Sequence, residues 1–302
     1  MAGGAKSEAA PLAIFKRLNA VWDARVARAR LLSSEQSGTT GILTFYAALA
    51  AYQQSLLQQN LANAGNEATA ARDGEATSLL DVLDVESVLP AVPAFLSWLS
   101  RTAPAHLATA AADMHRFDLV QWRDFMVTYL AHDWDDVDAA DATILFVIEC
   151  VLQPFAEWHA RSRPDNVLSS PSQSGTPQMA SRMPHACHIC GGLPVVAVLR
   201  EAGQGARRTL LCGLCLTESE YPRVVCPRCG EQQFDALPVY RAEQFPHVRI
   251  AACDSCRTYL KTIDLTKDGL AVPLVDDLAS LSLDLWAREQ DYTRLRPNLL
   301  RI

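Results

Sequence analysis

Residues 187–191 read Cys-His-Ile-Cys-Gly, and residues 226–230 read Cys-Pro-Arg-Cys-Gly. In each stretch two thiols are separated by two residues and a glycine follows, a pattern typical of a tight turn that presents two sulfurs to one metal ion. Glycine tolerates a positive φ and leaves backbone N–H groups near sulfur. Each turn is followed by a hairpin-like stretch and a second Cys-x-x-Cys pair, which begins at Cys212 in the first case and at Cys253 in the second.

The spacing of these pairs repeats along the chain. Twenty-one residues separate the two pairs of the first unit and 23 separate those of the second, with an offset of 39 residues at the start and 41 at the end. We therefore predict two tandem rubredoxin-like or zinc-ribbon β units, each with four sulfurs around a tetrahedral metal ion. The predicted ligands are Cys187, Cys190, Cys212, Cys215, Cys226, Cys229, Cys253 and Cys256. Spacing alone leaves open whether the pairs combine sequentially or are interleaved.

The ligand type restricts the metal and its chemistry. A tetrahedral site of four sulfurs suits zinc or iron, so we expect two such ions per chain, iron or zinc. Four sulfurs leave no position for water or substrate, and the sites are therefore expected to be structural or electron-transferring. The sequence contains no GxSxG, no HExxH and no phosphate-binding glycine loop. We predict no catalytic residues and no enzymatic activity.

Composition favours a folded cytoplasmic protein. Of the 302 residues, 49% are hydrophobic and 20% are charged, which is incompatible with disorder along most of the chain. We find neither a signal peptide nor an apolar run of about 20 residues. A cytoplasmic location disfavours disulfides among the eight clustered cysteines. The remaining cysteine, Cys150, lies in the apolar run ILFVIECVL and is expected to be a small buried residue.

The period of the apolar residues changes along the chain and gives an α+β fold. Two stripes recur every three or four residues and predict helices: Phe15, Leu18, Trp22 and Val26, and then Ile42, Phe45, Leu49, Tyr52 and Leu56. Further helices are expected over 78–100, bent or broken at Pro90 and Pro93, and over 106–131 and 138–160, the last capped by Asp138. A C-terminal helix is expected over 275–291, with an apolar stripe of Leu278, Leu281 and Leu285. Short β-rich runs are expected at 195–199, 207–211, 239–241, 248–252 and 258–264.

These elements define five segments. They are a helical bundle over 1–160, a linker rich in Ser, Pro and Gln over 161–184, a first metal ribbon over 185–224, a second over 225–270, and a C-terminal helix and tail over 271–302.

Charge weighs against nucleic-acid binding. The formal net charge is -7, and residues 185–302 hold 14 basic and 14 acidic residues before eight thiolates with two divalent ions add a formal -4. Four arginines, Arg207, Arg208, Arg249 and Arg257, are expected to offset thiolate charge. An acidic run of Asp133, Asp135, Asp136, Asp138 and Asp141 is interpreted as a solvated loop and helix start, with a docking surface for a basic peptide as the alternative.

The ordered motifs resemble the FdhE family, the formate dehydrogenase accessory proteins. The resemblance is carried by the four Cys-x-x-Cys pairs, by Cys215-Leu-Thr-Glu218, by Cys253-Asp-Ser-Cys-Arg-Thr-Tyr259-Leu-Lys261, by Asp276-Asp277-Leu-Ala-Ser-Leu-Ser-Leu-Asp284, and by the helical GILTFYAALAAYQQ. Ser219 departs from the family pattern, where an aromatic residue is expected after Thr-Glu.

The resemblance implies a non-enzymatic cytoplasmic maturation factor. Such a chaperone binds the catalytic subunit of a respiratory formate dehydrogenase exported by the twin-arginine route, with that subunit's signal peptide as a further candidate partner. It also implies contact roles for Glu218, Tyr259 and Asp277, each of which could equally support a metal site or cap a helix. Two other functions stay open: a redox or sulfur-handling protein that uses its thiolates or iron on the same client, and a zinc-ribbon nucleic-acid binder.

Overall fold

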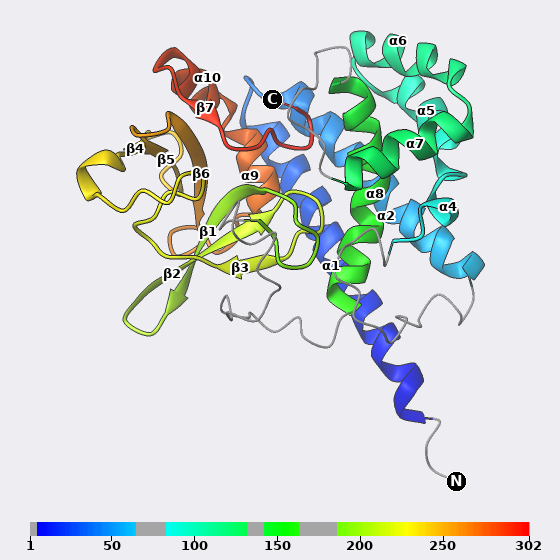
Figure 1. Cartoon of the computed structure of the whole chain (residues 1–302), viewed down its shortest axis with the longest axis horizontal. Coiled ribbons are helices and arrows are strands. Elements are labelled where there is room, and N and C mark those ends of the chain that lie inside the picture. Colours follow the sequence, from blue (N-terminus) through cyan, green and yellow to red (C-terminus); the bar gives the residue numbers. More distant parts are fainter. Residues whose placement is uncertain (1–4, 65–82, 132–141, 163–185, 302) are drawn as a thin grey trace. The chain divides into compact units, whose positions relative to one another are not determined.

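The computed structural model describes residues 5–64, 83–131, 142–162 and 186–301 (Figure 1). The chain divides into two compact units, one of Met1–Arg30 with Thr44–Pro164 and the other of Leu31–Leu43 with Asp165–Ile302. Apart from Arg161 and Ser162 at the end of one helix, the predicted linker lies outside the described residues, and so does the whole acidic run from Asp133 to Asp141, with the predicted helix cap Asp138. Among the described residues, no helix is long and apolar enough to cross a membrane.

The N-terminal half consists of helices, as the apolar period predicts. In chain order they are α1 (Ala5–Glu35), α2 (Thr40–Ala64), α4 (Val85–Val88), α5 (Ala91–Thr102), α6 (Ala105–Asp113), the 3₁₀ turn η2 (Met114–Arg116), α7 (Leu119–Leu130) and α8 (Ala142–Ser162). The predicted helix 106–131 is in fact two, because Asp118 starts a new helix: its side chain accepts from the N–H of Gln121, whose own side chain accepts from the Asp118 N–H.

The buried face of α2 differs by one residue from the predicted stripe. Leu43, Tyr46, Ala50, Gln53 and Leu57 are buried, whereas three of the five predicted positions are only half-buried. The apolar period does not predict this face because one of its positions is the polar Gln53.

Gln53 is buried for a specific reason. Pro154 lies inside α8 and has no N–H to donate to the carbonyl of Cys150, four residues earlier. The Nε2 of Gln53 donates to that carbonyl at 2.8 Å instead. Cys150 itself is buried, as predicted. In the same bundle Arg25 of α1 forms a buried bidentate pair with Glu157 of α8, with N–O distances of 2.8 and 2.7 Å.

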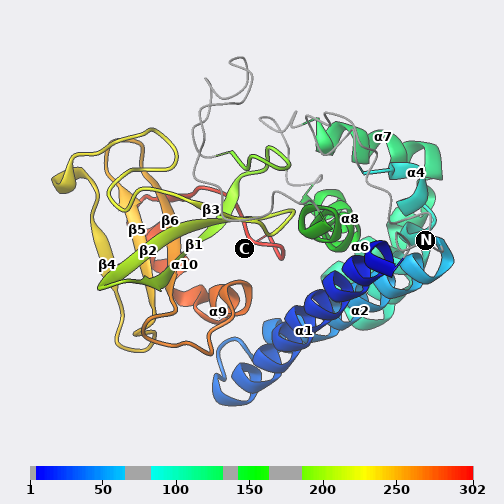
Figure 2. The same ribbon diagram turned by 90° about the horizontal axis from the view of Figure 1, so that it is seen from below.

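The second half is a mixed sheet with two C-terminal helices on one face (Figures 1 and 2). The elements are β1 (Pro194–Ala202), β2 (Gly205–Cys212), β3 (Glu218–Glu220), the 3₁₀ turn η3 (Phe234–Ala236), β4 (Val239–Arg241), β5 (Val248–Cys253), β6 (Thr258–Asp264), α9 (Pro273–Ala279), α10 (Leu281–Glu289) and β7 (Thr293–Arg294). All five predicted β runs are present. Together with the N-terminal helices they confirm the α+β class.

The two predicted ribbons join into one sheet. Its strand order is β3-β2-β1-β6-β5-β4, with β7 added beside β6. Neighbours within each predicted unit pair antiparallel, whereas β1 and β6 pair in parallel, with Ala197 opposite Thr262. Strand β6 therefore connects the half that contains the first cysteine group to the half that contains the second.

The sheet has two different faces. Val248, Ile250 and Ile263 pack with Leu283 and Ala287 of α10 on one face. On the other face a smaller apolar cluster contains Ala197, Leu210, Leu260 and Leu295, with Tyr221 beside it.

The predicted C-terminal helix is broken in two at Ser280, where φ is -98° and ψ is 35°. The break shifts the helical register, so Leu285 is exposed whereas Leu283 is buried, and the predicted leucine stripe is wrong. Its physical cause is the buried Lys261 of β6, whose Nζ donates to the carbonyl of Asp277 at 2.6 Å and to the Ser280 Oγ at 3.2 Å. In an unbroken helix the carbonyl of Asp277 would accept from a backbone N–H of the helix itself.

Candidate metal centres

The first knuckle is a tight turn closed by its own backbone. The N–H of Gly191 donates to the carbonyl of Cys187 at 2.7 Å, and the N–H of Cys187 donates to the carbonyl of Gly192 at 2.9 Å. Gly191 has a φ of 71°, which glycine adopts without the cost that a side chain adds. The second pair of the unit begins at the end of β2, where the N–H of Cys212 donates to the carbonyl of Thr217 at 3.0 Å.

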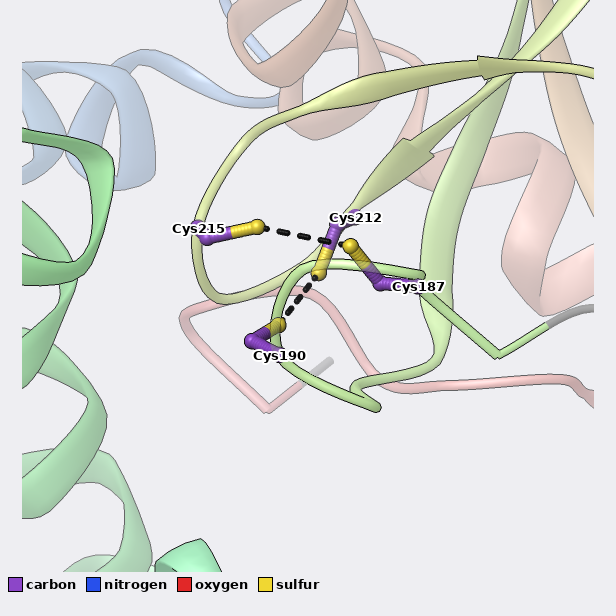
Figure 3. A group of neighbouring side chains, drawn as sticks. All are labelled: Cys187, Cys190, Cys212 and Cys215. Atoms are coloured by element: carbon purple, nitrogen blue, oxygen red, sulfur yellow. Dashed lines mark hydrogen bonds between the residues drawn. The ribbon is translucent and has the colours of Figure 1, made fainter. Parts of the chain in front are cut away.

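Four sulfurs converge where these segments meet (Figure 3). The Sγ of Cys187 lies 3.5 Å from that of Cys215, and the Sγ of Cys190 lies 3.4 Å from that of Cys212. All four sulfur atoms lie within 4.8 Å of one another. We call this group cluster 1.

The second group repeats the arrangement. The N–H of Gly230 donates to the carbonyl of Cys226, and the N–H of Cys226 donates to the carbonyl of Glu231, at 3.0 and 2.8 Å. The sulfur of Cys226 lies 3.7 Å from that of Cys256, and the sulfur of Cys229 lies 3.6 Å from that of Cys253. We call this group cluster 2. The pairs thus combine sequentially, which the spacing alone left open.

The donor set fits a tetrahedral metal ion. With a metal–sulfur bond of about 2.3 Å, the edge of a regular tetrahedron of sulfurs is about 3.8 Å. The four sulfur–sulfur distances given above, 3.4 to 3.7 Å, lie just below that value. They far exceed the roughly 2.05 Å of a disulfide, and all eight cysteines are free thiols. Each cluster can therefore hold one ion through four sulfurs, whichever metal it is.

The two clusters differ in exposure. All four cysteines of cluster 1 are buried, whereas in cluster 2 Cys229 is exposed and Cys256 is half-buried. The second residue between each pair of ligands follows the same division: Ile189 and Leu214 of cluster 1 are buried, and their counterparts Arg228 and Ser255 in cluster 2 are exposed.

Without a metal, the thiols of cluster 1 share their protons unequally. Hydrogen bonds from Cys187, Cys190 and Cys215, together with the charge of Arg296, hold the pKa of Cys212 well below its usual value. Hydrogen bonding within the cluster and burial raise the pKa of Cys190 and of Cys215 well above theirs. Cys212 is therefore the thiol of cluster 1 that ionises most readily, and a bound cation would favour ionisation of the others.

Arg296 is a feature of cluster 1 that sequence reasoning missed. Its guanidinium donates to the carbonyl of Leu193 at 3.3 Å and passes so close to Gly213 that a Cβ there would lie 2.6 Å from the arginine Nε. Gly192 is equally restricted, because its Cβ would lie 3.2 Å from the sulfur of Cys212 and 3.3 Å from that of Cys190. The glycines at these positions were the available signal, but Arg296 lies 81 residues beyond the last ligand of cluster 1.

Of the four arginines predicted to offset thiolate charge, Arg208 comes nearest to that role. It is buried, donates to the carbonyls of Pro222 and Val225 at 3.1 Å each, and holds the segment that leads into Cys226. Burial lowers its pKa to about 10, against the opposing effects of Tyr221 and Cys226.

The other three arginines contact different groups. Arg207 pairs with Glu220 at 2.8 Å, and Arg257 pairs with Asp254 at 3.2 Å and donates to the carbonyl of Gln290. Arg249 lies on β5 opposite Arg241 of β4. None of these contacts is to a cysteine.

The candidate partner-binding residues form contacts inside the protein. Glu218 of β3 accepts from Arg200 at 2.6 and 3.0 Å and from Thr209 at 2.8 Å. Tyr259 and Asp277 are each 1% exposed. Their contact with a partner stays a prediction, and in this fold the two side chains do not reach the surface.

Tyr259 and Asp277 belong to a buried ion network that connects the sheet to α9 and α10. Lys261 pairs with Asp277 at 3.0 Å and with Asp284 at 2.5 Å, and Arg294 pairs with the same two carboxylates at 2.6 and 2.9 Å. The hydroxyl of Tyr259 donates to Asp284 at 2.7 Å. Burial would raise the pKa of Asp277, but the charges of Arg294 and Lys261 prevail and lower it.

Other polar residues near the sheet also serve the fold. His188 is exposed, and its Nδ1 lies 3.1 Å from the Oγ of Ser219, the position that departs from the family pattern. A third group within 4.8 Å consists of His247, Asp268 and Asp276. There the Nε2 of His247 lies 2.8 Å from Asp276, which also accepts from the N–H of Val272 at 2.7 Å, so these groups tie α9 to the loop before β5.

Comparisons with known proteins point to one family. Residues 224–301 match the family model described as "FdhE, C-terminal domain". The chain is 41% identical over 116 residues to a "Protein FdhE homolog" of Aquifex aeolicus, covering 38% of this chain and 41% of that protein. It is 29% identical over 223 residues to a homolog of the same description from Pseudomonas aeruginosa, covering 68% of this chain and 67% of the relative.

A solved structure shares the whole architecture. "The crystal structure of the FdhE protein from Pseudomonas aeruginosa" superposes with a TM-score of 0.71 at 24% identity, covering 93% of this chain and 95% of the other. At this identity the match shows the fold. The sequence match to the Aquifex relative spans less than half of that relative's length.

Proposed function

We propose, from the likeness of this chain to FdhE proteins, that it is a non-catalytic accessory protein for assembly of a respiratory formate dehydrogenase. Its client is the catalytic subunit, bound in the cytoplasm before export by the twin-arginine route. The observation that carries the proposal is the pair of four-Cys clusters in one sheet, because a site saturated by sulfur supports a binding surface and has no position for a substrate.

The eight cysteines would hold two metal ions, iron or zinc, one in each cluster. A bound ion would fix the knuckle and the strand that ends at the second pair, and so make the sheet rigid. The protein's own contribution is the backbone turn of each knuckle and the charge of Arg296, which helps to lower the pKa of Cys212.

A genetic and biochemical experiment tests this function. In a formate-respiring host that lacks its own homolog, we expect this chain to restore formate dehydrogenase activity and to co-purify with the catalytic subunit. The matched variant is Cys212→Ser, which keeps the side-chain volume close but removes one of the four sulfurs of cluster 1. Restored activity without any association, or association only with nucleic acid, would contradict the proposal.

The acidic run of Asp133, Asp135 and Asp136 is proposed to attract the client's twin-arginine signal peptide. Such an interaction should weaken with salt, since it depends on attraction between opposite charges. Replacing the three aspartates with asparagine should weaken binding of the isolated signal peptide. Unchanged binding would exclude this role.

A further inference from the structure

Strand β4 forms an open edge of the sheet. It is last in the strand order, and among the described residues it pairs only with β5. The N–H of Ala252 donates to the carbonyl of Pro238, and hydrogen-bonded pairs alternate along an antiparallel ladder. Val239 and Arg241 therefore direct their backbone N–H and C=O groups away from β5, where the described part of the chain offers no backbone partner.

Three arginines gather on one face at this edge. Arg241 lies directly opposite Arg249, so their Cβ atoms are about 5 Å apart. Arg208 holds the carbonyl of Arg223 at 3.4 Å, which brings that residue to the same face. Burial and the charges of Arg241 and Arg223 lower the pKa of Arg249, although Asp264 opposes this. Three like charges so close together are repulsive unless an anion joins them.

Among the described residues, the carboxylate that acts on Arg249 is that of Asp264, which accepts from the N–H and the hydroxyl of Thr266 and forms no ion pair with the three arginines. No ion pair within 4 Å involves Arg223, Arg241 or Arg249 in the residues that the structure describes, whereas Arg200 and Arg207 of the same sheet pair with Glu218 and Glu220. Arg223 and Arg241 are exposed, and so are the apolar Val224 and Val239 beside them. The edge thus combines free backbone groups, positive charge and exposed apolar side chains.

We propose that the open side of β4 binds an extended acidic segment of a protein partner as an additional strand. The partner's backbone would pair with Val239 and Arg241, and its alternate carboxylates would face the three arginines. A protein segment is favoured over nucleic acid because the edge offers strand hydrogen bonds and valines, while the whole chain carries a net charge of -7. The partner is taken to be the formate dehydrogenase client, so the inference rests on the function proposed above.

Two variants of the full-length protein separate the two parts of this interaction. Arg241→Ser with Arg249→Ser removes charge and keeps the backbone. Val239→Pro keeps the arginines and removes an outward N–H, a change that edge strands tolerate because that donor does not pair within the sheet. The matched control is Lys267→Ser with Arg288→Ser, which removes two exposed cations from the loop after β6 and from α10. Circular dichroism and metal content establish that each variant is folded.

Binding of the purified catalytic subunit is then measured for all four proteins. We expect the arginine variant and the proline variant each to lose about tenfold in affinity and the control to match the wild type. The loss in the arginine variant should shrink as salt rises from about 0.05 M to about 0.5 M, whereas that in the proline variant should persist. Wild-type affinity in both folded variants would overturn the inference and leave the proposed function intact.

Two further outcomes are informative. If the wild type does not bind the catalytic subunit, the proposed function fails, and the partner assigned to this edge fails with it. If a labelled single-stranded oligonucleotide binds the wild type and is lost by the arginine variant, while the subunit binds both equally, the edge is a nucleic-acid site and the inference is overturned.

Discussion

Clusters 1 and 2 use the same knuckle but differ at its sixth position, which is Gly192 in the first and Glu231 in the second. In both, the carbonyl of this residue accepts from the N–H of the first cysteine. A Cβ at Gly192 would contact two sulfurs, whereas Glu231 extends outward and accepts from Ser255 at 2.7 Å. The same backbone can therefore enclose a metal site or leave it open to solvent, depending on the side chains around it.

The difference suggests a division of roles between the clusters. Cluster 1 is buried with apolar spacer residues, and Val195, Leu211 and Leu216 pack in the apolar cluster of the strands that lead to it. Cluster 2 is partly exposed and lies in the same half of the sheet as the open edge of β4. We expect cluster 1 to determine the stability of the fold. We expect cluster 2 to be the site that exchanges its ion with the solvent more readily.

The largest effect is expected from loss of a ligand. A structural zinc site contributes about 10–16 kcal/mol apparent at neutral pH in small peptides. Cys190→Ala should unfold the β1–β3 half of the sheet and leave the N-terminal helices, whereas Cys229→Ala should lose the ion of cluster 2 and keep that of cluster 1. Metal analysis with limited proteolysis measures this. Two ions retained in a protease-resistant Cys190→Ala protein would show that folding does not depend on cluster 1.

The next largest effect concerns the ion network that connects the sheet to α9 and α10. Removing one partner of a buried pair costs about 3–5 kcal/mol, because the remaining charge stays buried. Asp284→Asn should lower the free energy of unfolding by about this amount and destabilise both halves together. Chemical denaturation measures it, with the exposed Asp291→Asn as control. Independent unfolding of the two halves in the wild type would show that they are separate ribbons.

The same network predicts how the stability of the fold changes with pH. The pKa of Asp277 is lowered in the folded protein, so its contribution is fully present above the unfolded value of about 3.9 and is lost as pH falls through the folded pKa. Unfolding titrations from neutral to acid pH should therefore show a loss of stability below about pH 4 that Asp277→Asn reduces. An acid limb equally steep in this variant and in the wild type would contradict the assignment.

A smaller effect separates the two knuckles at their sixth position. Gly192→Ala inserts a methyl group between two sulfurs and should cost about 1–3 kcal/mol. Glu231→Ala removes a side chain that accepts from Ser255 and from two backbone N–H groups, and should lower the thermal midpoint less than Gly192→Ala does. Thermal unfolding of the metal-loaded proteins compares them. Equal behaviour of the two variants would mean that cluster 1 is not closely packed.

The smallest effect is kinetic. Exposure of Cys229 should let a chelator or a thiol reagent reach cluster 2 first, by about tenfold in rate, since opening of buried sites requires local unfolding. Mass spectrometry of the folded protein under chelation follows the loss, with labelled cysteines identifying the cluster. Simultaneous release of both ions would show that the two clusters do not differ in their accessibility to the chelator.

Much of this molecule could be predicted from sequence because its signals are local. The Cys-x-x-Cys turns, the β-rich runs and the period of Leu18, Trp22 and Val26 each depend on neighbours within a few residues. The difference in exposure between the clusters is also indicated by residues that lie between the ligands. These are apolar at Ile189 and Leu214 but polar at Arg228 and Ser255.

The features that sequence reasoning missed depend on distant partners. The parallel pairing of β1 with β6 and the place of Arg296 beside cluster 1 have no local signature. The break at Ser280 follows from Lys261 on another element, and burial of Gln53 follows from a proline in α8. Tyr259 and Asp277 were singled out by motif, but motif alone does not distinguish a surface contact from a buried ion network.

The most direct test of the account is X-ray absorption at the metal edge, combined with metal quantification, on the protein purified under reducing conditions. We predict two ions per chain, each with four sulfur neighbours at about 2.3 Å, and no change in this shell when Cys150 is replaced by alanine. A shell with fewer than four sulfurs, an oxygen ligand that exchanges with solvent, or a single ion shared between the clusters would contradict it.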